Sequence, residues 1–464
     1  MARNQITARY LDLVADGGMD AGELTETARQ GFDLAAASYE GRCLSRPVFL
    51  SAAETTQLAA DLERLHQALA SLPDRLFGGD MAAFARAAGL TGPQVEAVVR
   101  GRRATPTRLA RADMYHDGDG FRLMELNQGS AVGGLDTAML NRSLLTHPGI
   151  ASFVAEHRLS YVDTLAAMVD TLREECGLPA DARPVVAAVD WPESFVQLEA
   201  QLQHSAAALA PHGLDVIPCH LGQLRFADGR VWVGERPVDV LYRIFLLEDL
   251  LSPEGPGLIE PVLAAVERGE VTMFTPMDAE LFGSKASLAM LSDEAYRDRF
   301  EPELREVLDR LLPWTRLVRD EPVTVDGTTI NLRKYAIAHR EELILKPTGG
   351  HGGAGIVPGW RTDPDSWQEQ LEAAMDRPYV LQRRIRAVPE LFPTLDGSRQ
   401  LTPWLLRWGV FTVSRGYGGA TVVGVPGGQQ DVVNMSQGGT AGCCFHQQPV
   451  EADAETAAPR GSAP

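Results

Sequence analysis

The sequence predicts an α/β fold, and three observations support this prediction. The first segment of the chain is rich in Ala, Leu and Glu, and its apolar residues recur with helical periodicity, as in residues 52–65. Residues 184–218 contain a buried apolar run, a helical stretch and a second apolar run, which is the pattern of a βαβ unit. Residues 341–347 form a further strand-like run that leads into a glycine-rich loop.

The composition and the spacing of apolar residues change along the chain, and we expect five segments. In order, these are a mainly helical N-terminal region (1–107), a hairpin followed by helices (108–182), an additional α/β subdomain (183–280), a region that contains the glycine-rich loop (281–446), and a disordered tail (447–464). The tail is rich in Ala, Glu and Pro, a composition that buries too little apolar surface to become ordered. A chain of 464 residues is long enough for two or three domains.

Composition and charge argue against several classes of protein. The formal net charge of −19 disfavours nucleic acids and anionic membranes as partners, because both attract basic surfaces. No uninterrupted apolar stretch is long enough to cross a bilayer, and the polar N-terminus lacks the pattern of a signal peptide. Five cysteines without metal-binding spacing favour a reducing compartment, so we expect a cytoplasmic protein.

One short stretch contains a set of hard oxygen ligands. Asp113, Glu125 and Asn127 supply two carboxylates and an amide oxygen, the ligand type that holds Mg²⁺ when phosphate oxygens complete its coordination. Between them, residues 117–120 read Asp-Gly-Asp-Gly, a turn signal that predicts a β-hairpin. A two-residue loop would send Glu125 to the face opposite Asp113. A three-residue loop or a bulge would place all three ligands on one face, with Arg111 beside them.

Two plainer interpretations of the hairpin stay open. Its charged side chains could simply face water, as most charged side chains do. Arg111 could also form a structural salt bridge with Glu125 across the hairpin, a common and individually weak interaction. A structure with Glu125 on the face opposite Asp113 would remove the argument for a metal site.

Two lysines and the glycine-rich loop indicate an anion site. Lys346 lies in an apolar run, where an ammonium group without an anion would be costly, and the loop that follows lets backbone N–H groups approach a phosphate. Lys285 opens a helix, where the helix dipole disfavours a cation unless a phosphate is near; an exposed surface lysine is the alternative. No P-loop pattern follows, and the Rossmann fingerprint fits badly, so both are disfavoured.

Taken together, these segments resemble the circularly permuted ATP-grasp ligases, specifically the synthetase portion of glutathionylspermidine synthase and its relatives. In that family an Arg-x-Asp motif is followed by a Glu-x-Asn motif with twelve residues from Asp to Glu, the spacing of Asp113 and Glu125 here. The metal carboxylates come before the two ATP lysines, the reverse of an ordinary ATP-grasp chain. The resemblance covers roughly residues 30–445. Bifunctional members carry an N-terminal amidase domain for which this sequence has no room, so we expect a synthetase only.

The resemblance implies a role for each motif. It implies that Asp113, Glu125 and Asn127 bind Mg²⁺ and that Arg111 stabilises the charge of an acyl phosphate. The residues expected to bind ATP are two lysines, four loop glycines and the glutamine at the end of a hinge strand: Lys285, Lys346, Gly349, Gly350, Gly352, Gly353 and Gln382. Many relatives place a basic residue in the glycine loop, where this chain has His351.

The function implied by the resemblance is ATP-dependent ligation of a carboxylate to an amine through an acyl phosphate, with release of ADP and phosphate. We expect both substrates to be small molecules, although no motif identifies either one, because their pockets are built from variable loops. Phosphotransfer without amide formation and nucleotide binding without catalysis are the alternatives. The oligomeric state stays open, as do the roles of Arg407, Asn434 and His351.

Overall fold

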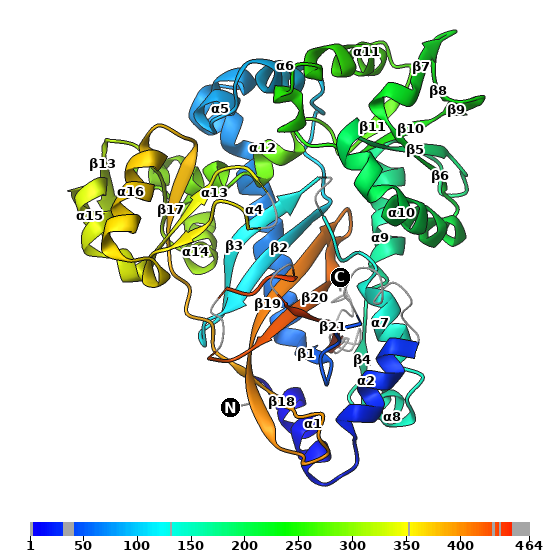
Figure 1. The fold of residues 1–464 in the computed structure, drawn as a ribbon, viewed down its shortest axis with the longest axis vertical. Helices are drawn as coiled ribbons and strands as arrows, with labels where there is room; N and C mark the ends of the chain where they lie inside the picture. The colour runs from blue at the N-terminus through cyan, green and yellow to red at the C-terminus, as the bar shows by residue number, and fades with distance from the viewer. Residues whose placement is uncertain are drawn as a thin grey trace, which may run out of the picture.

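The computed structural model describes residues 3–30, 41–129, 132–350, 353–428, 432–435 and 438–447. A mixed sheet of eight strands runs through the middle of the molecule (Figure 1). Its strands come from both halves of the chain: β1 (Val48–Leu50), β2 (Ala110–His116), β3 (Phe121–Gln128), β4 (Leu159–Ser160), β18 (Glu390–Pro393), β19 (Leu401–Val413), β20 (Gly416–Pro426) and β21 (Thr440–Gln447). The main path is β1-β21-β20-β19-β2-β3, so the predicted hairpin lies directly beside β19.

The described part of the N-terminal region is mainly helical and packs around the sheet. Its helices are α1 (Gln5–Ala15), α2 (Ala21–Gln30), α4 (Ala52–Phe77), α5 (Met81–Ala87) and α6 (Gly92–Arg100). Helix α4 begins with a capping box formed by Ser51 and Glu54, and it ends at Gly78 in the left-handed conformation, with φ of 61°. Its buried leucines recur three and four residues apart and give one apolar face: Leu58, Leu62, Leu65, Leu69 and Leu72. Part of α4 packs against β20.

The predicted βαβ unit is present and belongs to a parallel sheet. β5 (Val185–Asp190), α10 (Pro192–Leu209) and β6 (Asp215–His220) follow one another along the chain, and the two strands are parallel. β10 (Val240–Arg243) and β11 (Thr272–Phe274) complete the order β11-β10-β5-β6. Helices α7 (Thr137–Leu144) and α8 (Pro148–Glu156) pack beside β21 and β4 of the central sheet, and α9 (Thr164–Glu175) contacts β19 and β20. The remaining elements of this segment are β7 (Leu224–Ala227), β8 (Arg230–Val233), β9 (Arg236–Val238) and α11 (Gly255–Glu267).

A third sheet, this one antiparallel, lies on the opposite side of the central sheet from the parallel sheet (Figure 1). Its order is β12 (Thr315–Leu317), β17 (Tyr379–Arg383), β15 (Leu343–Pro347) and β16 (Val357–Pro358). The helices and hairpin around it are α12 (Ala279–Gly283), α13 (Lys285–Ser292), α14 (Pro302–Leu311), β13 (Pro322–Val325), β14 (Thr328–Asn331), α15 (Leu332–Ala338) and α16 (Pro364–Met375). Trp314, Leu345 and Trp367 belong to a separate apolar core in this part of the molecule.

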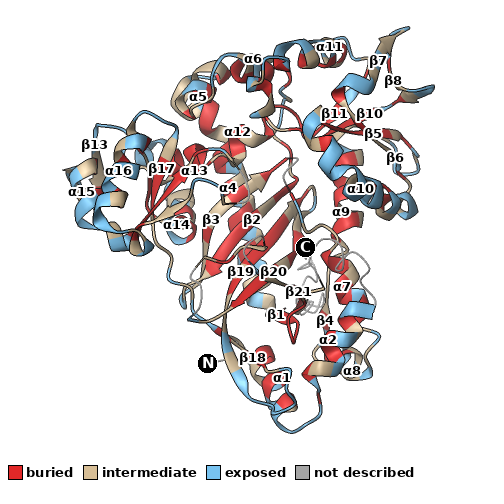
Figure 2. Cartoon of the chain, in the orientation of Figure 1, coloured by how far each residue is buried: buried red, intermediate tan, exposed pale blue. Residues whose placement is uncertain are grey.

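Burial follows this arrangement. Figure 2 shows buried residues along the strands of the central sheet and exposed residues on the outer faces of helices such as α10 and α15. Within the described ranges, no helix combines the length and the apolar character needed to cross a membrane. Gln447, which was expected to begin the tail, is the last residue of β21, and residues 448–464 lie outside the described ranges.

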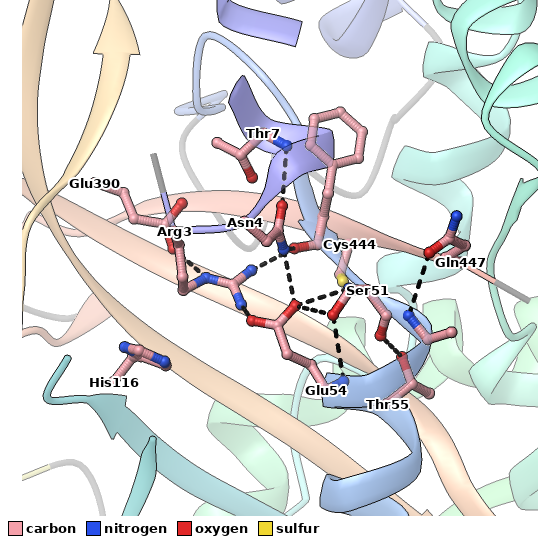
Figure 3. Close-up of polar contacts among 12 residues, drawn as sticks. Arg3, Asn4, Thr7, Ser51, Glu54, Thr55, His116, Glu390, Cys444 and Gln447 are labelled. Carbon is pink, nitrogen blue, oxygen red and sulfur yellow. Dashed lines mark hydrogen bonds and ion pairs between the residues drawn. The ribbon is translucent and has the colours of Figure 1, made fainter. Parts of the chain in front are cut away.

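A buried ion network joins the N-terminal segment to the central sheet (Figure 3). The Glu390 carboxylate accepts hydrogen bonds from Arg3 Nε and Arg46 Nη2, each at 3.0 Å, and Arg3 also pairs with Glu54. The Arg3 guanidinium lies over the ring of Trp408, 4.7 Å from its centroid. Burial opposes ionisation of Glu390, but the charges of the two arginines outweigh it and lower the pKa of Glu390.

We expect Glu390→Gln to lower the free energy of unfolding by about 3–5 kcal/mol, because it leaves the buried Arg46 without a counter-charge. Since the folded-state pKa of Glu390 is lowered, its contribution is present above the ordinary carboxyl pKa and is lost as pH falls through the folded value. Urea denaturation at pH 7 measures the loss. Glu301→Gln, which removes an exposed partner of Arg75, is the control and should cost less than about 1 kcal/mol. Equal losses in the two variants would contradict this account.

Candidate active site

A β-bulge sets the geometry of the hairpin. His116 pairs with Phe121 next to the turn, but Asp113 pairs with Glu125, so the register shifts by one residue between them. The extra residue is Met124, because Met114 lies opposite Leu123. Arg111, Asp113, Glu125 and Asn127 therefore lie on one face of the hairpin, and all of them line a single cavity. The turn itself keeps the register of a two-residue loop at Gly118 and Asp119, since Asp117 N–H donates to the carbonyl of Gly120. The bulge, one of the two arrangements compatible with a shared face, brings Glu125 back to the face of Asp113.

The Asp113 carboxylate is fully buried between two arginines. Arg111 reaches it with two hydrogen bonds, Nε to Oδ1 at 2.7 Å and Nη2 to Oδ2 at 2.9 Å. Arg407, from the neighbouring strand β19, also donates to Oδ2, and Asn127 Nδ2 lies 3.2 Å from the same oxygen. The interpretation of the hairpin as a set of water-facing charges is therefore wrong, and Arg111 pairs with Asp113 on its own strand rather than with Glu125.

Gly409 makes this arrangement possible. It lies opposite Asp113 on β19, and a Cβ atom there would come within 2.8 Å of Arg111 Cδ. The absence of a side chain lets Arg111 lie across the neighbouring strand. Any larger residue at position 409 would push the Arg111 side chain away from Asp113.

The two predicted lysines come together around Glu125. Lys285 Nζ lies 3.2 Å from Glu125 Oε2, and the backbone N–H of Lys285 donates to the carbonyl of Thr348, which ties the start of α13 to the end of β15. Lys346 Nζ donates to Gln382 Oε1 at 2.8 Å and lies 3.4 Å from the carbonyl oxygen of the bulged Met124. Three lysines occur in the whole sequence, and two of them meet here.

The surroundings of Glu125 and Lys346 shift the pKa of both side chains. Burial opposes ionisation of Glu125, but the charges of Lys285 and Lys346 outweigh it and lower the pKa of Glu125 to about 2. Burial lowers the pKa of Lys346 to about 8, although the charge of Glu125 acts in the opposite direction. Glu125 is therefore ionised throughout the neutral range, whereas Lys346 loses its charge just above it.

The cavity into which these groups point has a volume of about 830 Å³. Most of the predicted residues that the structure describes lie in its wall: Arg111, Asp113, Glu125, Asn127, Lys346, Gly353 and Gln382. Lys285 reaches the site through Glu125 without lining the cavity, and Gly349 and Gly350 lie outside its wall. Gly352 and His351 fall outside the described residues.

Three features of the site were given no definite role by the sequence. Arg407, whose role the sequence left open, is a direct partner of Asp113. Arg384 stacks over the ring of Trp360, 4.1 Å from its centroid, and both residues line the cavity beyond Gln382. One wall is contributed by α9 and α10, helices without any motif. The scarcity of lysine was the one signal in the sequence that could have strengthened the assignment of Lys285 and Lys346.

Of the three predicted magnesium ligands, two are suitably placed to bind an ion and one is not. Glu125 and Asn127 project side by side from β3 into the cavity, and Asn127 directs its amide nitrogen to Asp113, which leaves its oxygen as an acceptor. Asp113 Oδ2 already accepts from both arginines and Asn127, so little acceptor capacity remains for a metal. Within the described part of the chain, no cluster of three or more His, Cys, Asp or Glu side chains has the arrangement of a metal site.

Comparisons with known proteins bear on the fold. A glutathione synthetase-like effector from Globodera pallida, solved in its apo form, has a TM-score of 0.54 at 14% identity, covering 92% of this chain and 98% of that one. The chain has an ATP-grasp-like fold. D-alanyl-alanine synthetase A from Vibrio cholerae matches with a TM-score of 0.26 and 13% identity over 48% of this chain and 68% of that one, too low to carry an argument. No family model matches the sequence.

In sequence, the chain is similar to a protein from Mycobacterium leprae named "uncharacterized protein ML0605". The two are 26% identical over an alignment of 355 residues, and the match covers 71% of this chain and 57% of the relative. The match thus spans little more than half the length of that relative. An identity of 14% to a solved structure shows the fold and not the activity, so the glutathionylspermidine synthase group and the circular permutation stay predictions.

For the ATP site that the sequence predicts, the pKa of Lys346 implies that binding depends on pH. Above about pH 8 the Lys346 amine is neutral, so binding a phosphate requires uptake of a proton, and the Kd for ATP should rise by up to about tenfold per pH unit. Lys346→Met should bind ATP weakly with a flat profile over the same range. Isothermal titration between pH 6.5 and 9.5 measures this, with Lys334→Met, on exposed α15, as the control. A wild-type profile that stays flat up to pH 9.5 would contradict the prediction.

Proposed function

We propose that the protein is an ATP-dependent ligase that joins a small-molecule carboxylate to an amine. The observation that carries this proposal is the convergence of Lys285 and Lys346 on Glu125, which lines the same cavity as Arg111, Asp113 and Arg407. Four cationic side chains gather there against two carboxylates, in a protein whose net charge is −19. A cavity with surplus positive charge attracts a polyanion, and a nucleoside triphosphate is the polyanion that the ATP-grasp-like fold favours.

The arrangement of side chains supports one orientation for ATP. Lys346 and Gly353 would contact the phosphates, where the charges of the site are concentrated. The adenine ring would lie against Ile344 and Ile356, close to Gln382, which supplies an amide at the edge of this apolar part of the wall. This placement of ATP keeps the roles that the resemblance implied for Lys346 and Gln382.

Glu125 and Asn127 are the residues that would hold a magnesium ion between the protein and the phosphates. Such an ion would neutralise part of the triphosphate charge when bound. Asp113 has a different role in this proposal: its buried carboxylate holds the guanidinium groups of Arg111 and Arg407 in fixed positions. Preorganised donors of this kind stabilise charge that develops during a reaction without needing to move.

The proposed reaction has two steps. A carboxylate oxygen of the first substrate attacks the γ-phosphorus of ATP, the bond to ADP breaks, and an acyl phosphate forms. The amine nitrogen of the second substrate then attacks the acyl carbon, phosphate leaves, and the amine loses a proton as the amide forms. Arg111 and Arg407 would contact the carboxylate and then the acyl phosphate, whose oxygens carry the negative charge.

Product analysis tests this proposal. We expect release of ADP and free phosphate that depends on both a carboxylate and an amine, in a screen of amino acids, carboxylates and amines. A stable phosphorylated product that needs no amine would identify a phosphotransferase instead, and nucleotide binding without turnover in the whole screen would identify a binding protein.

The described cysteines are all free thiols, which supports a reducing compartment such as the cytoplasm as the place of the reaction.

Arg111→Ala should lower kcat by about two to three orders of magnitude, the range for losing one preorganised charge-stabilising donor. ATP affinity should change little, because Lys285, Lys346 and Glu125 are retained. Steady-state ADP release and nucleotide titration measure the two quantities on variants checked by thermal melting. Arg122→Ala is the matched control, since it removes an arginine from the same hairpin that pairs with Asp117 outside the cavity. Normal turnover together with a lower Tm would make Arg111 a structural residue.

Glu125→Gln should instead change the metal dependence of turnover. The substitution removes the charged oxygen that would face magnesium, so we expect the Mg²⁺ concentration for half-maximal activity to rise at least about tenfold. Magnesium titrations of ADP release measure it, with Asp117→Asn in the hairpin turn as the control. An unchanged Mg²⁺ requirement in Glu125→Gln would remove Glu125 from the proposed metal site.

A further inference from the structure

The cavity has a second, apolar half that the proposed nucleotide does not occupy. Its wall is formed by α9, α10 and the face of the parallel sheet that points toward them. We call this part the apolar chamber, and its main contributors are Leu165, Met168, Leu202, Leu209, Val216 and Tyr242. Leu165 and Met168 come from α9, the next two residues from α10, and the last two from β6 and β10.

Along helix α10 the wall of the chamber passes from a packed core to an uncovered apolar surface. Leu198, Leu202, Ala206 and Leu209 recur three and four residues apart, so they share one face of the helix, and this face lines the cavity. Near the helix C-terminus Leu209 is buried, whereas Leu198 is 37% exposed although it belongs to the same apolar stripe. The part of the stripe at Leu198 and Leu202 is left uncovered along the cavity wall, and an apolar ligand would cover it.

A cationic part of the same cavity adjoins the chamber, because Val132 packs with Leu165 and Met168 and the carbonyl of the next residue, Gly133, accepts a hydrogen bond from Arg111. Arg111 and Arg407 lie in the wall of the same cavity, held by Asp113 on the central sheet. A ligand that fills both parts must therefore combine an anionic group with a hydrocarbon group. A carboxylic acid with an apolar substituent has this combination, whereas a small polar acid would leave the stripe on α10 exposed to water.

We infer that the carboxylate substrate of this protein carries an aliphatic or aromatic group, which lies in the apolar chamber while its carboxylate contacts Arg111 and Arg407. This inference rests on the proposed ligase function and adds the chemical class of one substrate. The chamber sets specificity by the area of hydrocarbon that it removes from water, and the arginines set the position of the reacting group.

A series of straight-chain carboxylates from acetate to octanoate tests the inference. Binding is measured by calorimetry with a non-hydrolysable ATP analogue and Mg²⁺ present, so that no turnover is needed. We expect Kd to fall by about fourfold for each added methylene until the chamber is filled, which corresponds to about 0.8 kcal/mol per group. An affinity that stays flat along the series, with the nucleotide bound, overturns the inference.

Substitutions at two adjacent positions on α10 test whether the hydrocarbon chain of the carboxylate binds in the apolar chamber. Ser205 lines the cavity and is exposed, so Ser205→Trp should fill the chamber without disturbing the core, raising the Kd of octanoate more than tenfold and leaving that of acetate unchanged. His204→Trp, on the neighbouring exposed position outside the cavity wall, should leave both values unchanged. Equal effects of the two variants on octanoate overturn the placement of the substrate.

The same measurements separate this inference from the proposed function. If affinity rises with chain length but no carboxylate and amine together release ADP, the ligase proposal fails and the chamber is still a binding site for apolar acids. If short polar carboxylates drive ADP release better than the longer apolar ones, the ligase proposal holds and the inference about its substrate is wrong.

Discussion

The buried carboxylate of Asp113 is the constraint on which the site depends. A carboxylate removed from water needs compensating charges and hydrogen bonds, and removing one partner of such a group commonly costs several kcal/mol. The partners here are Arg111 on β2 and Arg407 on β19, so the hairpin and a strand nearly 300 residues later in the sequence must lie side by side. The central sheet and the polar end of the cavity are therefore specified by one cluster of charges.

The same cluster explains how so acidic a protein can offer a cationic cavity. The acidic residues are spread over the chain, whereas Arg111, Arg407, Lys285 and Lys346 are brought to one place by three separate pieces of structure. Glu125 is ionised with a pKa of about 2 and offsets part of the lysine charge, which reduces repulsion between the two ammonium groups before an anion arrives. The positive charge that remains in the cavity is local, so it cannot be inferred from the net charge of −19 of the whole protein.

The sequence predicted the features that depend on neighbours along the chain. The hairpin, the βαβ unit and the strand that contains Lys346 all follow from short-range patterns, and the structure has each of them. The position of the bulge did not follow, because turn residues specify a hairpin but leave its register open. Arg407 as a partner of Asp113, the stack of Arg384 on Trp360 and the apolar face of α10 were also missed. These features depend on contacts between segments that are far apart in the sequence, and the local spacing of residues does not predict such contacts.

The bulge at Met124 has a consequence for how related sequences can vary. Lys346 and Gln382 approach the backbone carbonyl of Met124 and not its side chain, so replacing the side chain leaves the oxygen in place. Position 124 can therefore change in identity during evolution while the junction between the hairpin and β17 persists. The number of residues in the hairpin cannot vary in the same way. Gain or loss of one residue between the turn and Glu125 would remove or double the bulge and turn the carboxylate to the far side of the sheet. We therefore expect an insertion or deletion in this part of the hairpin to be more damaging than a substitution of Met124.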